Sequence, residues 1–210
     1  MPAPHRLMLF AAAVALLALT PGPVWLYLIS RTLAQGRRAG YTSLFGVAAG
    51  VSVHVLLAAL GLSVLLKTVP LAFDGLKLAG AAYLLWLAVS TLRGGGISFT
   101  PQPLPPQRDG VLFRQAMLAS VINPKVAVFY LSLFPQFIDP QGSVFLQGCV
   151  LGLIHIAVSS LIDGALVTVA GALARWFAQR PLWLRTQRWF LGGAFGALAA
   201  WLALTPRQGA

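Results

Sequence analysis

A few polar side chains lie inside long apolar stretches, where they are costly unless they take part in chemistry. The clearest is Lys125, which follows Asn123 and Pro124 in the middle of an apolar run. An ammonium group at the centre of a membrane helix costs about 2.5–3.5 kcal/mol, so it persists only against a counter-charge or a wet cavity. Lys125 could therefore bind the carboxylate of a small substrate or pair with Asp163.

A helix-breaking motif, Thr20-Pro21-Gly22-Pro23, interrupts the first apolar run, and Pro124 interrupts another. Proline lacks a backbone N–H and clashes with the preceding turn, so both runs should be broken or kinked. Freed backbone groups are tolerated in lipid only where they line a cavity, which predicts a substrate site between the two breaks. A simple proline kink is the alternative for either motif alone. The candidate substrate-binding residues are Thr20, Pro21, Gly22, Pro23, Asn123, Pro124 and Lys125.

Three more titratable residues, His54, His155 and Asp163, also fall within apolar runs. Histidine titrates near neutrality, so either histidine could carry a proton, although both could equally be structural residues of the core. Asp163 is the only acid deep in an apolar run. These three residues are the candidates for proton coupling.

The elements that position these residues follow from composition. Of 210 residues, 58% are hydrophobic and only 9% are charged, whereas soluble domains carry about 25% charged residues. A soluble fold of this size could not bury so much apolar surface. The composition excludes an ordinary soluble enzyme and a disordered chain, and it predicts an all-α membrane protein within the lipid bilayer.

Six segments are apolar and long enough to span a bilayer, which needs about 20 residues. A linker rich in glycine and proline (93–111) separates a first half (1–92) from a second half (112–210), with three spans in each, in one integral membrane domain. The predicted spans are Leu7–Ile29, Tyr41–Leu66, Val69–Leu92, Leu112–Ile138, Val144–Ala174 and Leu184–Leu204.

The distribution of cations predicts the orientation. The chain has 15 Lys and Arg against 4 Asp and no Glu, a net charge of +11. Such a charge can indicate a nucleic-acid partner, but the excess of positive charge on cytoplasmic loops of membrane proteins explains it better, so no nucleic acid is expected. Ten of the cations lie in or beside three loops, 30–40, 93–111 and 175–188. These loops should be cytoplasmic, and both termini should then face outward.

The two halves resemble each other in sequence. PGPVWLYL from Pro21 matches PKVAVFYL from Pro124, and LAGAAY from Leu78 matches LGGAF from Leu191. Glycines also precede the histidine in both middle spans, at Gly46 and Gly50 before His54 and at Gly148 and Gly152 before His155. Halves with three helices each can only repeat in inverted orientation. The glycines themselves most simply serve close helix packing.

Several motifs together resemble the LysE/RhtB family of amino-acid exporters. They are Thr20-Pro21-Gly22-Pro23, GRRAG at 36–40, LKLAGAAYLLWLA from Leu76, and SVINPKVAVFYLSLFPQFIDP from Ser120 to Pro140. The resemblance implies a six-helix exporter of the bacterial inner membrane, which moves amino acids or related metabolites outward at the expense of the proton-motive force. The family pattern usually has Asp or Asn where this chain has Val24, which implies a different substrate, an altered coupling route through Asp163 or a histidine, or a lost function.

Other functions remain as alternatives. A metal-ion exporter would need clustered ligands, but His155 and Asp163 lie about two helical turns apart, too far to bind one ion. A passive channel is a further alternative. Catalytic motifs such as HExxH and GxSxG, an ATP-binding loop and a second cysteine are all absent from the sequence. No enzyme activity, metal site or cofactor is therefore expected, while a homo-oligomer is compatible with the glycine motifs.

Overall fold

The structure is a computed structural model that describes residues 3–68, 104–139 and 141–179, together with isolated positions between 75 and 93 and between 186 and 204. Every regular element in the three continuous ranges is a helix. The predicted spans Val69–Leu92 and Leu184–Leu204 fall largely outside the described residues. Where single positions are described, Gly192 lies against Leu92 and the carbonyl oxygen of Ala88.

The first apolar run forms two helices. Helix α1 spans Pro4–Leu19 and helix α2 spans Pro23–Gln35, and their axes differ by 58° across the break at Thr20-Pro21-Gly22. Pro23 is the first residue of α2, a position where a missing N–H costs no helical hydrogen bond. The break predicted from the proline motif is confirmed.

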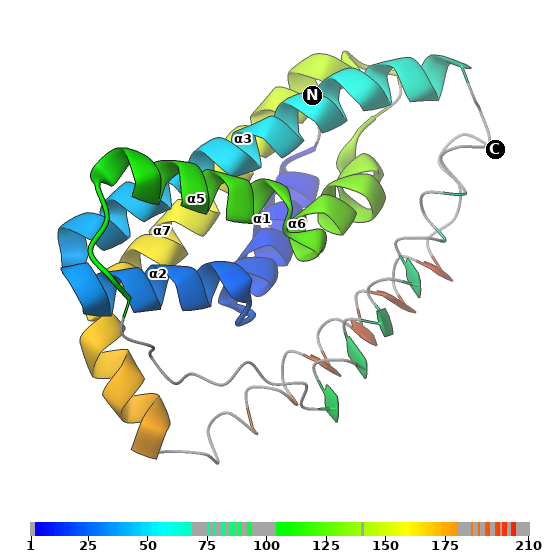
Figure 1. Ribbon diagram of the computed structural model, residues 1–210. Coiled ribbons are helices and arrows are strands. Elements are labelled where there is room, and N and C mark those ends of the chain that lie inside the picture. Colours follow the sequence, from blue (N-terminus) through cyan, green and yellow to red (C-terminus); the bar gives the residue numbers. More distant parts are fainter. Residues whose placement is uncertain are drawn as a thin grey trace.

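Two long helices form the centre of the molecule. Helix α3 spans Arg37–Thr68 and helix α7 spans Val144–Gln179, and they run in opposite directions beside each other (Figure 1). The stretches Arg37–Gly61 and Val144–Ala172 are each long and apolar enough to cross a bilayer. Within the described residues, α3 and α7 are the two helices that are each long and apolar enough on their own. The bent pair α1–α2 is long and apolar enough when its two helices are counted as one span.

The fourth predicted span is broken into several pieces. Helix α5 spans Asp109–Val121, helix α6 spans Pro124–Val128, and a π-helical turn, η1 (Phe129–Leu133), leads into a 3₁₀ turn, η2 (Phe134–Phe137). The break falls at Ile122 and Asn123, directly before Pro124. The second predicted break is therefore also confirmed, although the π-helical turn after it was not expected.

Each broken helix packs against the long helix of the other half. Helix α5 lies along α3, while α1 and α2 both contact α7 (Figure 1). Glycines permit the close approach: a Cβ atom at Gly50 would lie 2.6 Å from the carbonyl oxygen of Met117, and one at Gly152 would lie 2.8 Å from Val55 Cγ2. The packing role expected for these glycines is confirmed.

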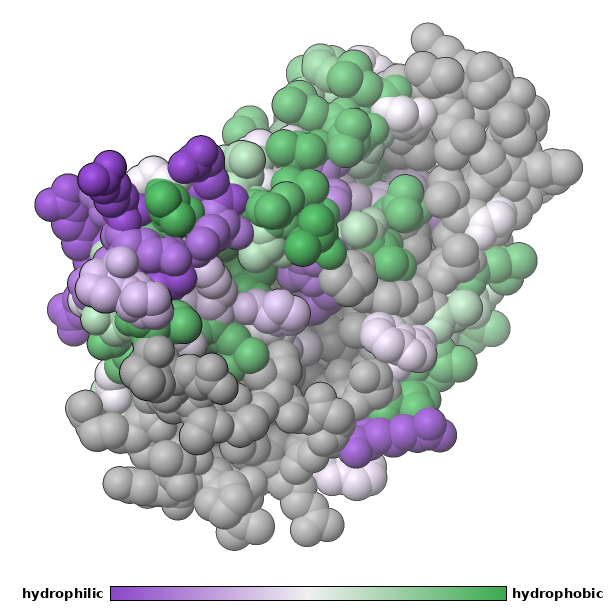
Figure 2. Space-filling view, viewed as in Figure 1, coloured by the Kyte–Doolittle hydropathy of each residue, from purple (hydrophilic) through white to green (hydrophobic). Residues whose placement is uncertain are grey.

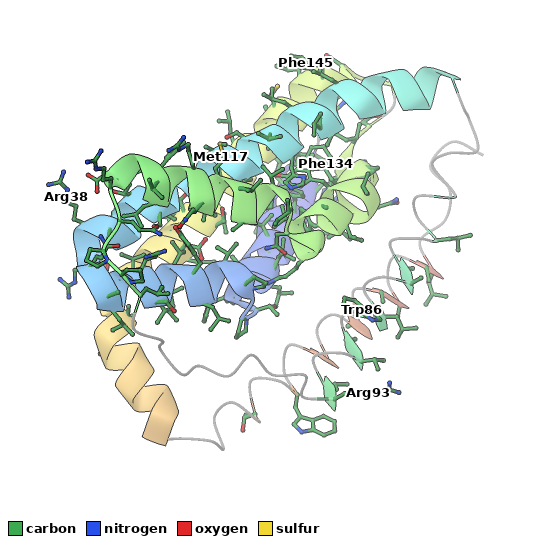
Figure 3. The ribbon with its side chains drawn as sticks, in the orientation of Figure 1. Arg38, Trp86, Arg93, Met117, Phe134 and Phe145 are labelled. Atoms are coloured by element: carbon green, nitrogen blue, oxygen red, sulfur yellow. The ribbon has the colours of Figure 1, made fainter. Side chains whose placement is uncertain are left out.

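Aromatic side chains fill the interior near the second break. The ring of Phe10 on α1 lies 5.1 Å from that of Phe137 and 5.9 Å from that of Phe134, measured between ring centroids. Phe134 is fully buried and points inward, whereas Phe145 at the start of α7 is partly exposed (Figure 3). This cluster fixes η1 and η2 against α1, and so it positions the residues that precede them.

Hydrophilic side chains gather at one end of the molecule, where α2 ends and α3 and α5 begin, and hydrophobic side chains are frequent on the coloured surface beyond (Figure 2). The first two loops expected to be cytoplasmic meet at this end, and the last described turns of α7 extend toward it (Figure 1). Exposed apolar residues such as Phe45, Leu57 and Leu118 suit a surface that faces lipid. The sidedness itself remains a prediction.

Two predicted loop boundaries are wrong. The region 30–40 is helical except at Gly36, whose φ of 83° lets a single residue turn the chain between α2 and α3. The region 175–188 is helical as far as Gln179. Loop ends were inferred from arginine positions, but a helix can carry arginines beyond the bilayer surface. At about 1.5 Å per residue, the 36 residues of α7 exceed the 30 Å hydrocarbon core.

The segment ahead of α5 is bound to α2, and we call residues 104–108 the strap. Gln35 donates its side-chain amide to the Gln107 carbonyl oxygen (2.9 Å) and accepts from the Gln107 backbone N–H (3.0 Å). Arg31 donates Nη1 to the carbonyl oxygen of Pro105 (3.1 Å). Arg38 forms a salt bridge of 2.9 Å with Asp109. Helix α5 begins at Asp109, so it includes three residues that were assigned to the linker.

Candidate functional site

The two helix breaks meet at one cavity. It measures about 50 Å³, which is room for a few water molecules. Helices α1, α2, α3, α5, α6 and α7 all contribute to it, so the site lies between the two halves. Its polar and charged lining residues are Thr20, Ser120, Asn123, Lys125, His155, Ser159 and Asp163, together with Trp25.

The ammonium group of Lys125 connects the two breaks. Its Nζ donates a hydrogen bond of 2.7 Å to the backbone carbonyl oxygen of Thr20. Thr20 is the residue at which α1 ends, so its carbonyl lacks a helical partner and is free to accept. A Cβ atom at Gly22 would lie 3.9 Å from the same Nζ, so the first break approaches the ammonium group at Gly22 as well.

Backbone groups at both breaks find partners within the protein. The side chain of Asn123 accepts from the backbone N–H of Lys125 (3.1 Å) and so caps the start of α6. The hydroxyl of Thr20 donates to the carbonyl oxygen of Leu16 (2.7 Å). Asn and Thr are suited to these positions because their short side chains reach adjacent backbone groups. The breaks are thus built into the sequence and are not local distortions.

Asp163 brings a carboxyl group to the cavity. It is only 5% exposed, and it interacts electrostatically with Lys125. Within the described residues the only salt bridge is Arg38–Asp109, so Lys125 and Asp163 are not in direct contact. The buried indole N–H of Trp25 lies close enough to interact with the Asp163 carboxyl, but no hydrogen bond of normal geometry joins them. The cavity is therefore lined by one amine and one carboxyl group that form no salt bridge with each other.

Helix α7 presents a polar stripe to the cavity. His155, Ser159 and Asp163 are spaced four residues apart, so they lie on one face of the helix, and all three are buried. Ser159 was missed from sequence. Its position midway between two candidate residues was the signal that could have identified it.

A stack of three rings adjoins the cavity. Tyr130 in η1 lies between His54 and His155, with ring centroids 5.7 and 5.2 Å away and interplanar angles of 6° and 8°. The Tyr130 hydroxyl and His155 Nδ1 are hydrogen-bonded at 2.9 Å. His54 Nε2 lies 3.1 Å from the carbonyl oxygen of Val121, the last residue of α5. Tyr130 was also missed, although it matches Tyr27 in the proposed repeat.

The rest of the cavity wall is apolar. Leu17, Val47, Val51 and Val126 contribute to it, as does Val24, which stands where the family resemblance leads one to expect Asp or Asn. The first turn of α2 therefore contributes no acidic side chain to the cavity. Asp163 on α7 is the acidic residue that lines the cavity among the described residues.

The candidate residues separate into two groups. Thr20, Gly22, Asn123, Lys125, His155 and Asp163 all line the cavity. Pro21, Pro23 and His54 do not line it, and Pro124 is placed as the first residue of α6. The prolines shape the backbone, and His54 contacts the cavity only through Tyr130 and His155. No group of three or more His, Cys, Asp or Glu that could hold a metal ion occurs in the described parts of the chain.

Comparisons with known proteins agree on one family. A homoserine/homoserine lactone efflux protein of Salmonella typhimurium (strain LT2) is 34% identical over 90% of this chain and 91% of its own length. A leucine efflux protein of Salmonella choleraesuis is 32% identical over 72% of this chain and 76% of its own. An uncharacterized membrane protein of Pseudomonas aeruginosa is 38% identical over 81% of this chain and 82% of its own length.

No solved structure matches the chain. The family model of the LysE type translocators matches residues 15–205, nearly the whole length. Together with the apolar helices and the membrane-protein relatives, this match identifies a multi-pass membrane transporter and not an enzyme. The chain belongs to the LysE type translocators.

Proposed function

We propose that this protein is a secondary active exporter of amino acids that carry one ammonium and one carboxylate group. The observation that carries the proposal is the placement of Lys125 and Asp163 in one cavity between two broken helices. Opposite charges that are buried but not paired with each other match a zwitterionic ligand. The relatives named as efflux proteins for homoserine and for leucine support this substrate class.

In this proposal Lys125 binds the substrate carboxylate. Its ammonium is held by a neutral carbonyl, that of Thr20, and a carboxylate is a stronger hydrogen-bond partner. The first turn of α2, which begins beside the same cavity, adds the partial positive charge of a helix N-terminus. Asn123 holds the Lys125 backbone in place by accepting from its N–H.

Asp163 then binds the substrate ammonium group. It can hold either a proton or that ammonium group, but not both, because a protonated carboxyl has no charge to offer. This competition couples outward movement of substrate to inward movement of a proton. The proton-motive force is thus the proposed energy source.

In this proposal, movement of the two halves against each other exposes the cavity to one side of the membrane and then to the other. We propose residues 1–92 and 112–210 as inverted repeats of three spans, joined by the linker 93–111. The packing of α5 on α3 and of α1 and α2 on α7 supports this arrangement, because each broken helix lies on the partner half. Rocking of the halves would open the cavity to either side of the bacterial inner membrane, with both termini on the outer side.

The test is transport by purified protein in lipid vesicles. L-Leucine and L-homoserine should exchange in counterflow, where labelled substrate outside replaces unlabelled substrate inside. The amines formed by decarboxylation and the acids formed by deamination should compete at least tenfold less well, because each lacks one charge. Equal competition by either analogue would contradict the proposal.

A further inference from the structure

Proton delivery to Asp163 is the step that the proposed function leaves open. Asp163 is buried beside Trp25 and is only 5% exposed, so a proton must reach it through the protein. The polar stripe of α7 offers a route. From Asp163 it runs through Ser159 to His155, two helical turns or about 12 Å nearer the end of α7 that should face outward.

We propose that His155 is the proton donor to Asp163 and that Tyr130 is the positioning residue that fixes its exchanging nitrogen. The proposal rests on the proposed proton-coupled export. It depends on the hydrogen bond between Tyr130 and His155 Nδ1, which occupies one of the two ring nitrogens. His155 lines the cavity, and within the described residues its Nε2 has no hydrogen-bond partner and is not a fully enclosed atom.

The ring stack supports a fixed orientation. Tyr130 lies nearly parallel to both histidine rings, and His54 is in turn held by the Val121 carbonyl. Phe129 packs its edge on His155, with centroids 5.3 Å apart at 88°. His155 is therefore held by Tyr130 and Phe129, and it also lines the polar cavity. The titratable and charged groups around it are Tyr130 from η1, His54 from α3, Lys125 from α6 and Asp163 on its own helix.

One proton moves from His155 to Asp163, and His155 is then protonated again. Protonated His155 releases the proton on Nε2 to cavity water, and the proton passes beside the Ser159 hydroxyl to the carboxylate of Asp163. The carboxylate becomes a neutral acid and releases the substrate ammonium group. The remaining imidazole keeps its proton on Nδ1, donated to the Tyr130 oxygen, and Nε2 takes the next proton from water on the outer side. The cavity of about 50 Å³ has room for the few waters that are needed.

Tyr130→Phe is the decisive variant because it retains the stacked ring and removes only the hydroxyl. Tyr27→Phe is the matched control: its hydroxyl bonds Leu112 and Gln115, away from the stripe. Two rates are measured in lipid vesicles, counterflow at equal pH on both sides and substrate movement driven by a pH gradient. We expect Y130F to keep counterflow within twofold of wild type and to lose at least tenfold in gradient-driven movement. Y27F should retain both rates.

Other results would contradict either the inference or the proposed function. If Y130F leaves both rates unchanged, or lowers both equally, Tyr130 has no role in proton delivery and the inference is wrong. Tyr130→Met provides a second variant if Y130F does not fold: it fills the same space with a flexible apolar side chain and lacks the hydroxyl, so the same split is expected between the two rates. Absence of counterflow in the wild type would instead refute the proposed function. Counterflow with normal gradient coupling in both variants would refute only the route.

Discussion

The ammonium nitrogen of Lys125 lies 2.7 Å from the backbone carbonyl oxygen of Thr20, a residue 105 positions earlier in the chain. The bond joins the two helix breaks, which belong to different halves of the protein. A backbone carbonyl is available there only because α1 ends at that point. The site therefore depends on the prolines through backbone geometry, and on Lys125 through charge.

Lys125→Gln should lower the affinity for zwitterionic substrates about 10- to 100-fold, because one charge-assisted hydrogen bond contributes roughly 1.5–3 kcal/mol. Counterflow in lipid vesicles, measured over a range of substrate concentrations, gives the affinity. Arg114→Gln is the control, since Arg114 is an exposed cation on α5 whose Nε bonds the Gly110 carbonyl oxygen. Equal losses in both variants would mean that the effect comes from net charge and not from the site.

Asp163→Asn should abolish the pH dependence of substrate binding. In the wild type, binding should weaken as pH falls, because protons compete with the substrate ammonium group for the carboxylate. An amide cannot be protonated in this range, so binding to D163N should be weaker and constant with pH. Calorimetric titration of substrate at several pH values measures this. A pH dependence that persists in D163N would place the coupling group elsewhere.

Val24→Asp should shift the preference toward substrates with a second ammonium group. Val24 lines the cavity, and a carboxylate there would stand beside Asp163 as a second anionic group. We expect the ratio of lysine to leucine counterflow to rise about tenfold, which corresponds to roughly 1.4 kcal/mol. Val24→Asn separates charge from polarity and should leave the ratio near that of wild type. An equal shift in both variants would argue against an electrostatic origin.

Gly152→Ala should destabilise the protein by about 1–3 kcal/mol, the usual cost of forcing a methyl group into a packed interface. The new Cβ would meet the side chain of Val55 on α3. Gly61→Ala is the comparison within α3, because a Cβ atom there has nothing within 4 Å. Thermal unfolding in detergent, followed by fluorescence, should show a lower Tm for G152A alone. Similar Tm values for the two variants would show that the glycine contact is not essential.

Residues that break helices made part of this fold predictable. Pro21, Pro23 and Pro124 cannot continue a regular helix, so the positions of both breaks followed from sequence. Lys125 was predicted to need either a counter-charge or a wet cavity, because a lone ammonium group is costly in lipid. These inferences depend on single residue types, proline for the backbone and lysine for charge, and they require no knowledge of tertiary contacts.

Tertiary packing determined what could not be predicted. The π-helical turn at Phe129–Leu133 precedes Pro135, which cannot donate a hydrogen bond to the turn before it. The position of Pro135 therefore indicates an irregular turn here, and the prediction did not include it. The stack around Tyr130 joins three separate elements, and no periodicity in one sequence shows such a contact. Helix ends at Gly36 and Gln179 were misplaced because charge marks the bilayer surface and not where a helix stops.

The strap has a mechanical consequence. Its hydrogen bonds to Arg31 and Gln35 attach the start of α5 to the far end of α2. Helix α2 leaves the first break, and α5 leads into the second. If α2 tilts, it must either pull α5 with it or break three hydrogen bonds. The two broken helices are thus linked to each other at the end opposite α1, and in the proposed transport cycle they would move together.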